Sequence, residues 1–335
     1  MVEYLKLLLS FHLALYHLRL LKLLPAWQRL QGANSLCSDA SCPMKPREML
    51  ALQGDCPYQL GLFVDLTGKA DSAAALLAEQ SADGYFRRIP SFVRAYFAAR
   101  KFDEFSEHLV RRGKLIRPLN STFSVGELFG LQTEQFTDER EKFFGERLSG
   151  LLESLSDDAA GLDAEVETLT RMGLSDFETY IEILVSLRGA FHRQYIVQAF
   201  DATMQKNRPG ALLAQPRAKN APRRFVLESR LLEVLLQIAV LRPGGDQEYH
   251  TGEMRIDDLL TFLRERYGLY IDQLPTGEGF GSPSIEDRKA LRANVQAFTA
   301  RLREIGFYRD LSDAYVTQTV VPRYTIAEET EGAKA

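Results

Sequence analysis

The sequence has few cysteines and almost no net charge. Three cysteines in 335 residues are too few for a disulfide-stapled scaffold. Forty-one Lys and Arg residues against 45 Asp and Glu residues give a net charge of -4, so no whole-chain field attracts the protein to nucleic acid or anionic lipid. Binding of either kind must therefore be local. A composition of 45% hydrophobic and 26% charged residues indicates a globular protein, and the length predicts two domains or three.

Common catalytic motifs are also missing. The sequence contains no phosphate loop of the Gly-x4-Gly-Lys-Ser/Thr kind, no Gly-x-Gly-x-x-Gly, no His-Glu-x-x-His and no Gly-x-Ser-x-Gly. The five histidines are scattered along the chain, at His12, His17, His108, His192 and His250. These absences favour a non-enzymatic protein, with a subunit of an enzyme as the alternative.

The N-terminal segment Tyr4 to Leu24 is rich in leucine and is about as long as a membrane span. Cations within it, including Lys6 and Lys22, oppose insertion into a bilayer. We expect a helix that protein encloses on all sides and that ends at Pro25. A basic amphipathic helix on a lipid surface is the alternative. Because helical periodicity starts within four residues of the N-terminus without a capping residue, we also expect a longer natural protein or an earlier start codon.

The cysteines Cys37, Cys42 and Cys56 lie within twenty residues of one another, in a polar stretch with no apolar period. An odd number of cysteines without an export signal predicts a cytoplasmic protein. Three thiolates at this spacing are candidate ligands of zinc or of an iron-sulfur cluster, with a fourth ligand from elsewhere. Free cysteines that pack as small apolar groups are the alternative.

The first 207 residues predict a mainly helical domain. One strand is expected at Tyr58 to Leu66, where apolar residues alternate. Ser175 and Glu178 have the spacing of a capping box and predict a helix start. The expected helices after the first cover residues 73–79, 86–110, 127–156, 162–172 and 175–206. The stretch 127–156 is expected to be broken at Gly130 and Gly145.

Residues 208–224 predict a basic, Pro-rich linker without acidic residues. Its cations Arg217, Lys219, Arg223 and Arg224 are candidates for contacts with phosphates. A second domain is expected over residues 225–326, and residues 327–335 are expected to form a disordered acidic tail.

The second domain shows three helical segments, at residues 226–241, 259–267 and 284–305, followed by two strands around residues 307–309 and 315–324. This order resembles the winged helix, a variant of the helix-turn-helix. The resemblance implies a third helix that enters the major groove and a wing that lies against phosphates. By position, the contacting residues would be Arg288, Lys289, Arg292, Arg309 and Arg323. Winged helices also bind proteins, and the two roles stay open at this point.

The whole chain resembles uncharacterised accessory proteins of bacterial anti-phage defence islands, such as the modification-associated systems. The resemblance rests on the aromatic-rich helical body, the Cys-Pro pairs and the run Gly306-Phe307-Tyr308-x-Asp310-Leu311-Ser312-Asp313-Ala314-Tyr315. It implies a subunit of a multi-protein complex that recognises or restricts DNA. The fold expected from the sequence is mainly α with minor β, and the expected partners are double-stranded DNA, protein subunits or both, without a membrane. A subunit with a metal cluster in a nucleic-acid-processing enzyme is the alternative.

Overall fold

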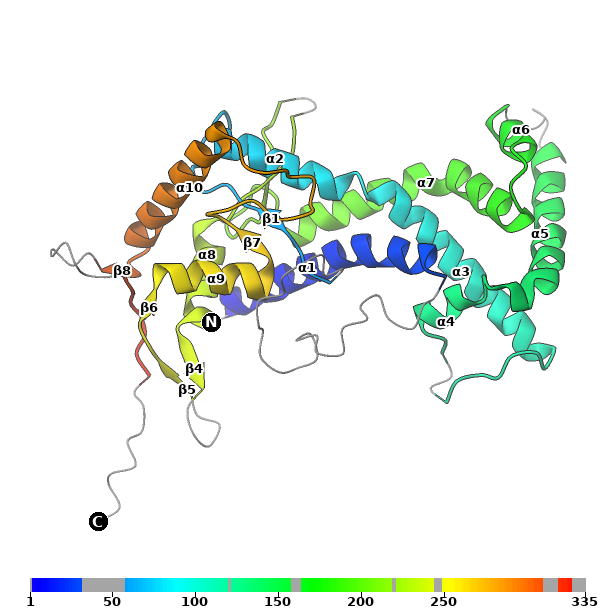
Figure 1. Cartoon of the computed structure of the whole chain (residues 1–335), viewed down its shortest axis with the longest axis horizontal. Coiled ribbons are helices and arrows are strands. Elements are labelled where there is room, and N and C mark those ends of the chain that lie inside the picture. Colours follow the sequence, from blue (N-terminus) through cyan, green and yellow to red (C-terminus); the bar gives the residue numbers. More distant parts are fainter. Residues whose placement is uncertain are drawn as a thin grey trace, which may run out of the picture. The chain divides into compact units, whose positions relative to one another are not determined.

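A computed structural model describes residues 2–31, 58–119, 122–157, 164–218, 221–243, 249–309 and 319–326 (Figure 1). The fold is mainly helical with a few small sheets, which confirms the expected fold class. The helices are α1 (Val2–Arg29), α2 (Ala73–Phe86), α3 (Ile89–Arg111), α4 (Val125–Gly130), the short 3-10 helix η1 (Glu134–Phe136), α5 (Thr137–Asp157), α6 (Ala164–Arg171), α7 (Asp176–Thr203), α8 (Ser229–Ala239), α9 (Ile256–Tyr267) and α10 (Ile285–Glu304). The strands are β1 (Leu62–Phe63), β2 (Leu213–Ala214), β3 (Arg224–Phe225), β4 (Leu241–Pro243), β5 (Tyr249–Thr251), β6 (Met254–Arg255), β7 (Leu269–Tyr270), β8 (Tyr308–Arg309) and β9 (Thr319–Val320).

The chain divides into two compact units. Unit 1 takes its described residues from 1–18, 41–86 and 200–335, and unit 2 takes them from 19–40 and 87–199. This division differs from the one expected from the sequence, because β1 pairs in parallel with β7 and α2 packs against α10 and β3. The expected linker, 208–224, lies within unit 1, where β2 and β3 pair with each other. Independent folding of either unit stays a prediction.

The core of unit 1 is built around β1 and one buried amide. Asn294 of α10 is fully buried. Its side-chain nitrogen donates to the carbonyl oxygens of Val64, at 2.9 Å, and Ile271, at 3.0 Å, and its oxygen accepts from the Leu66 N–H at 2.9 Å. Because these partners come from the end of β1 and from the residue after β7, one side chain fastens α10 to both strands.

A buried ion pair closes the same end of β1. The carboxylate of Asp65 has no exposed surface, and its Oδ2 lies 3.4 Å from Nε of Arg224, whose side chain is 10% exposed. The other oxygen accepts from the Thr67 N–H at 2.9 Å and from the Thr67 hydroxyl at 2.6 Å. Asp65 also forms a parallel bridge with Val226, which places β1 between β7 and the residues after β3. Strand β1 is therefore surrounded by segments that lie far from it in the sequence.

The C-terminal part of unit 1 contains α8, α9 and α10 and a three-stranded antiparallel sheet in the order β6-β9-β8. Helix α9 ends at Gly268, whose φ is +72°. A Cβ at this position would lie 2.4 Å from the Leu60 carbonyl oxygen, so both the backbone angle and the space require glycine. Helix α10 begins with the capping box of Ser284 and Asp287, as the sequence predicts.

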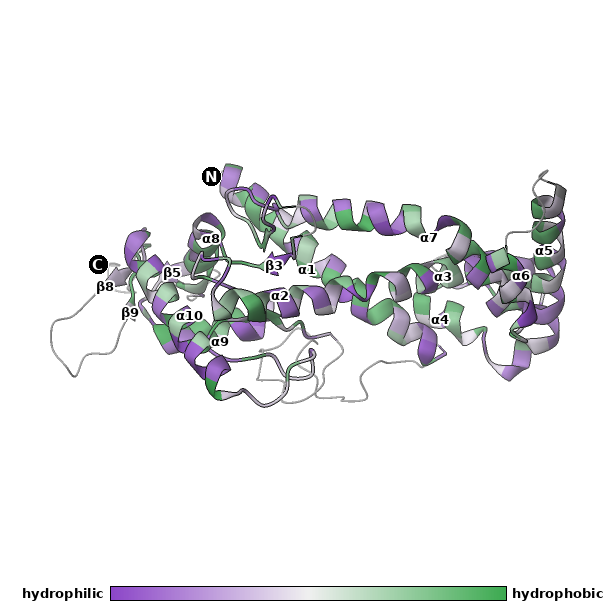
Figure 2. Cartoon of the chain, turned by 90° about the horizontal axis from the view of Figure 1, so that it is seen from above, coloured by the Kyte–Doolittle hydropathy of each residue, from purple (hydrophilic) through white to green (hydrophobic). Residues whose placement is uncertain are grey.

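Unit 2 is a set of helices with an aromatic core. Phe102 and Phe105 of α3 are fully buried. Phe102 meets Phe177 of α7 with ring centroids 4.5 Å apart, and Phe144 of α5 lies 4.7 Å from Phe177. These rings join α3, α5 and α7 around one cluster. Hydrophobic and hydrophilic residues alternate along α7, as the colours of Figure 2 show.

The first helix corrects one expectation. α1 continues through Pro25 and ends at Arg29. Proline removes only its own N–H from the ladder, and packing beyond it maintains the helix: a Cβ at Gly126 of α4 would lie 2.9 Å from the ring of Trp27. The close approach of α4 to Trp27 fixes the last turn of α1 within unit 2.

The helical stretch expected over residues 127–156 is broken at Gly130, where α4 ends, as the sequence predicts, but the break expected at Gly145 is wrong, because α5 runs through that position. The structure divides this stretch into α4, η1 and α5. The turn between them is held by Arg140, whose Nη1 donates to the Gln132 carbonyl oxygen at 2.7 Å and to the Leu131 carbonyl oxygen at 3.3 Å. A side chain from α5 thus satisfies carbonyl groups at the end of α4, which lets the chain turn.

Candidate functional site

The cations expected to read DNA lie at the start of α10. Arg288, Lys289 and Arg292 are all exposed. The opposite face of the helix is buried as expected at Leu291, Phe298 and Leu302, while Val295 is half-buried. The buried Asn294 was not expected, although it lies three residues after Leu291 and four before Phe298, which is the spacing of that face.

Acidic side chains share the exposed face of α10. Nζ of Lys289 lies 2.8 Å from a carboxylate oxygen of Glu286, and Asp287 caps the helix. The side chains of Arg288 and Arg292 form neither a hydrogen bond nor an ion pair with any described residue. Within the described part of the chain, two free cations rather than three are therefore available at this end of α10.

The cation near the expected wing is engaged within unit 1. Nη1 of Arg323 lies 2.8 Å from Glu233, and the same carboxylate oxygen accepts from the Tyr4 hydroxyl at 2.7 Å. The hydrogen bond to Glu233 raises the pKa of Tyr4, because the bond is made by the neutral phenol. Arg323 therefore already has a partner in a polar cluster with Glu233 and Tyr4.

The cations of the basic stretch before β3 lie in different surroundings. Arg223 lies 3.2 Å from Asp201 and 5.0 Å from the ring centre of Phe86. Arg217 is exposed. Arg224 is buried against Asp65, so its guanidinium offers little surface to a phosphate, and its contact with phosphates stays a prediction. Burial of a charge is tolerated here through the pairing.

The remaining candidates lie outside what the structure describes. These are Lys219, the side chain of Arg309, and the three thiols Cys37, Cys42 and Cys56. The metal site formed by the thiols therefore stays a prediction. Among the residues that are described, no group of three or more His, Cys, Asp and Glu side chains is placed to hold a metal ion.

Helix α1 presents an exposed apolar face, which corrects the expectation that protein encloses it on all sides. The opposite face is buried, with Phe11 packed against Tyr267 at a ring distance of 5.3 Å. On the exposed face, Leu9 is 62% exposed and Leu5 is 57% exposed. We name as the α1 stripe the exposed residues Val2, Leu5, Leu9, Leu13 and Tyr16.

By length and composition, α1 could also cross a membrane. Its most apolar window of 18 residues has a mean hydropathy of 1.4, and 28% of that window is buried. Core helices of soluble proteins and signal sequences have a similar length and hydropathy, so one such helix is weak evidence for a membrane span.

Unit 2 exposes a second, smaller group of apolar side chains. Leu187, Phe191 and Tyr195 follow one another at four-residue steps on α7 and are all exposed. The rings of Phe191 and Tyr195 are 4.5 Å apart. This spacing places the three side chains on one face of the helix.

The described part of the chain is a mainly helical protein that exposes apolar side chains on α1 and α7 and cations on α10. Residues 1–324 match the family described as "Methylation-associated defense system protein MAD7". The chain belongs to this family and is a component of a bacterial anti-phage defence system, which confirms the resemblance to accessory proteins of defence islands. No curated protein and no solved structure matches the chain.

Proposed function

We propose that this protein is a non-enzymatic cytoplasmic subunit of a multi-protein defence assembly, and that it binds another protein subunit through the α1 stripe. The exposed stripe is the observation that carries the proposal. Contiguous apolar surface on a folded protein marks a binding site more often than isolated exposed residues do. Membership of a defence-system family supports a role among several proteins.

The geometry of the stripe indicates a helix as the partner element. Its residues follow one another at steps of three and four positions, from Val2 to Tyr16, which is the spacing of a helix-packing seam. At 1.5 Å per residue the stripe is about 21 Å long, enough for four turns of a partner helix. Such a helix would bring Leu, Ile or Phe residues at the same spacing.

The charges beside the stripe favour an apolar partner face. Glu3 and Lys6 flank it and pair with each other at 3.0 Å, so they leave little net charge for a charged ligand to recognise. Exposed pairs of this kind contribute little energy themselves. Binding would therefore come mainly from removal of the leucine side chains from water.

The test is co-expression of the full chain with the other proteins of its defence system, followed by co-purification. The variant Leu5→Glu/Leu9→Glu places two carboxylates on the stripe, and we expect it to lose its partner. Leu76→Glu, at an exposed leucine of α2, is the matched control and should retain the partner. Circular dichroism checks that both variants fold.

Two results would reject the proposal. One is retention of every partner by the Leu5→Glu/Leu9→Glu variant. The other is sedimentation of the wild-type protein with vesicles of phosphatidylglycerol and phosphatidylethanolamine in a manner that the variant loses, which would assign the stripe to a membrane surface.

DNA binding through α10 is a second candidate function, favoured by the two free cations Arg288 and Arg292. The order α8, β6, α9, α10, β8, β9 and the sheet order β6-β9-β8 support a winged helix. In such a fold the start of the third helix faces the major groove.

The charge-reversal variant Arg288→Glu/Lys289→Glu/Arg292→Glu tests the second candidate. We expect weaker duplex binding for all sequences, and a salt slope that falls by about 0.9 for each phosphate that the variant no longer neutralises. Fluorescence anisotropy at several salt concentrations measures both. Arg171→Glu, at an exposed arginine of α6 that is not a candidate for phosphate contact, is the control. An unchanged affinity in the triple variant would reject DNA binding by α10 and leave protein docking.

A further inference from the structure

The residues of the α1 stripe are spaced symmetrically about Leu9. Leu5 lies four positions before Leu9, and Leu13 lies four positions after it. The end residues, Val2 and Tyr16, lie seven positions before and seven after. On a helix of 3.6 residues per turn, residues four or seven positions away lie within about 40° of Leu9 around the axis. A half-turn about an axis through Leu9, perpendicular to the helix, therefore maps the stripe onto itself.

Such a stripe is complementary to a second copy of itself. In a homodimer with twofold symmetry, the same patch on each copy forms the interface. If two α1 helices run antiparallel about the axis through Leu9, the two Leu9 side chains meet on the axis, and Leu5 of each copy meets Leu13 of the other. Val2, the smallest side chain of the stripe, meets Tyr16, the largest, which keeps the helices evenly spaced. A parallel pair would place Tyr16 against Tyr16 and Val2 against Val2, and the gap would be uneven.

The charges beside the stripe are compatible with this pairing. Lys6 and His12 are exposed and lie three positions before and three after Leu9, at opposite edges of the stripe. In the antiparallel pair, Lys6 of each copy therefore faces His12 of the other, and the two Lys6 side chains stay apart. Glu3 pairs with Lys6 of its own chain at 3.0 Å. The arrangement thus opposes neither two lysines nor two carboxylates across the seam.

The exposed area of the stripe suits a weak dimer. Its residues range from 46% exposed at Leu13 to 67% exposed at Val2. At on the order of 100 Å² of exposed surface for each residue, two copies would bury about 1,000 Å² in total, which is the lower end of specific protein interfaces. Because association also costs translational and rotational freedom, an interface of this size predicts a dissociation constant in the micromolar range.

We propose that the α1 stripe binds the α1 stripe of a second copy of this chain, with the two helices antiparallel about a twofold axis through Leu9. The inference rests on the proposed role of the stripe as a docking surface and names the subunit that covers it. Helix α1 itself supplies what that surface requires, which is a helix with leucines at steps of three and four positions. The defence assembly would then contain two copies of this protein.

Sedimentation velocity of the isolated full chain tests self-association, from about 1 µM to about 100 µM, a range that brackets micromolar dissociation constants. We expect the mass to rise from the 37.9 kDa of one chain toward twice that value. Leu9→Glu places two carboxylates against each other on the axis and should weaken the dimer by about 100-fold or more, because both charges lose water without gaining a partner. Leu76→Glu, at an exposed leucine of α2, is the matched control and should dimerise like the wild type. Circular dichroism checks that both variants fold.

A complementary pair of variants tests the antiparallel register. Leu5→Glu and Leu13→Lys each place a lone charge in the seam, so each variant by itself should be monomeric. When the two are mixed, the introduced carboxylate faces the introduced ammonium, and the unchanged leucines at the other end face each other. The mixture should therefore form a one-to-one dimer. A mixture of Leu5→Glu with Leu9→Lys is the control, because these positions do not face each other, and it should stay monomeric.

Three results would overturn the inference. They are a wild-type chain that is monomeric over the whole range, a dimer that Leu9→Glu leaves intact, and a mixture of Leu5→Glu and Leu13→Lys that stays monomeric. The first of these is distinguishable from failure of the docking surface itself. If the wild-type chain is monomeric but Leu5→Glu/Leu9→Glu still loses its co-purified partners, the stripe docks a different protein. If that variant keeps every partner as well, both proposals fall.

Discussion

Asn294 offers a direct test of how unit 1 is held together. Its side chain supplies hydrogen bonds to the Val64 and Ile271 carbonyl oxygens and to the Leu66 N–H. Asn294→Leu has a similar volume and no polar atoms. It would leave three backbone groups buried without this partner, at the end of β1 and after β7.

The expected cost follows from those three groups. An unsatisfied buried backbone group costs about 1–3 kcal/mol, and the greater apolar character of leucine offsets part of the loss. We therefore expect Asn294→Leu to lower the free energy of unfolding by about 3–5 kcal/mol. This is a large part of the roughly 5–15 kcal/mol that stabilises a typical domain.

Urea unfolding followed by circular dichroism measures the effect. With an m-value of about 3 kcal/mol per M, the midpoint should fall by about 1 M or more. Gln296→Leu is the matched control, because Gln296 lies on the exposed face of the same helix, and its midpoint should stay within a few tenths of a molar of the wild-type value. A loss below about 1 kcal/mol for Asn294→Leu would refute the argument that this amide fastens α10 to both strands.

Three further changes probe other parts of unit 1. Arg224→Met should cost about 3–5 kcal/mol in thermal melts, because the buried Asp65 carboxylate loses its partner, and Asp65→Asn should restore part of the loss; equal stability of the single and double variants would contradict this. Phe298→Ala should cost about 3–5 kcal/mol through a cavity, measured by urea unfolding, and an unchanged midpoint would count against its place in the core. Burial lowers the pKa of His17, so the folded state binds its proton less readily than the unfolded state, and stability should fall as the pH drops below about 6.5. His17→Phe should reduce this loss between pH 7.5 and 5, and the same pH profile in wild type and variant would argue against that role.

Local signals in the sequence predicted much of the helical structure. The capping boxes at Ser175 and Ser284 and the left-handed Gly268 mark helix ends where expected, because these signals act within a few residues. The errors in the predicted helix ends and breaks come from tertiary contacts. The packing of Trp27 against α4 carries α1 past Pro25. Helix α5 continues through Gly145, which lies close to Asp176 of α7. Neither contact is visible in a local pattern.

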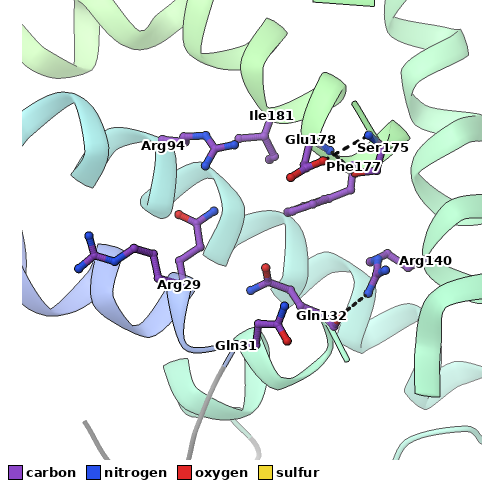
Figure 3. Close-up of a pocket in the computed structure, with 10 residues that line it drawn as sticks. Arg29, Gln31, Arg94, Gln132, Arg140, Ser175, Phe177, Glu178 and Ile181 are labelled. Carbon is purple, nitrogen blue, oxygen red and sulfur yellow. Dashed lines mark hydrogen bonds between the residues drawn. The ribbon is translucent and has the colours of Figure 1, made fainter. Parts of the chain in front are cut away.

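The candidate sites show the same difference between local signals, which the sequence reveals, and tertiary contacts, which it does not. The sequence selected Arg288 and Arg292 by their position at the start of the third helix of the second domain, and both are exposed. It also selected Arg224 from the composition of a basic stretch, but the contact that buries this residue is with Asp65, whose position depends on pairing between distant strands. A cavity in unit 2, lined by residues that include Arg94, Arg140 and Glu178 (Figure 3), was missed because its residues come from four helices and the turn after α4, and only the fold brings them together.

The position of β1 has a consequence for how the chain is made. Strand β1 obtains its neighbours from residues around 225, 269 and 294. At about 5–20 residues per second, a ribosome needs roughly 10 to 50 s to pass from residue 62 to residue 294. During that interval Leu62, Phe63 and Val64 have α2 beside them but lack these later partners, and long-range pairing of this kind slows folding further. A chain released before residue 269 would present this strand to other chains, so premature termination should yield aggregates rather than a partly folded unit 1.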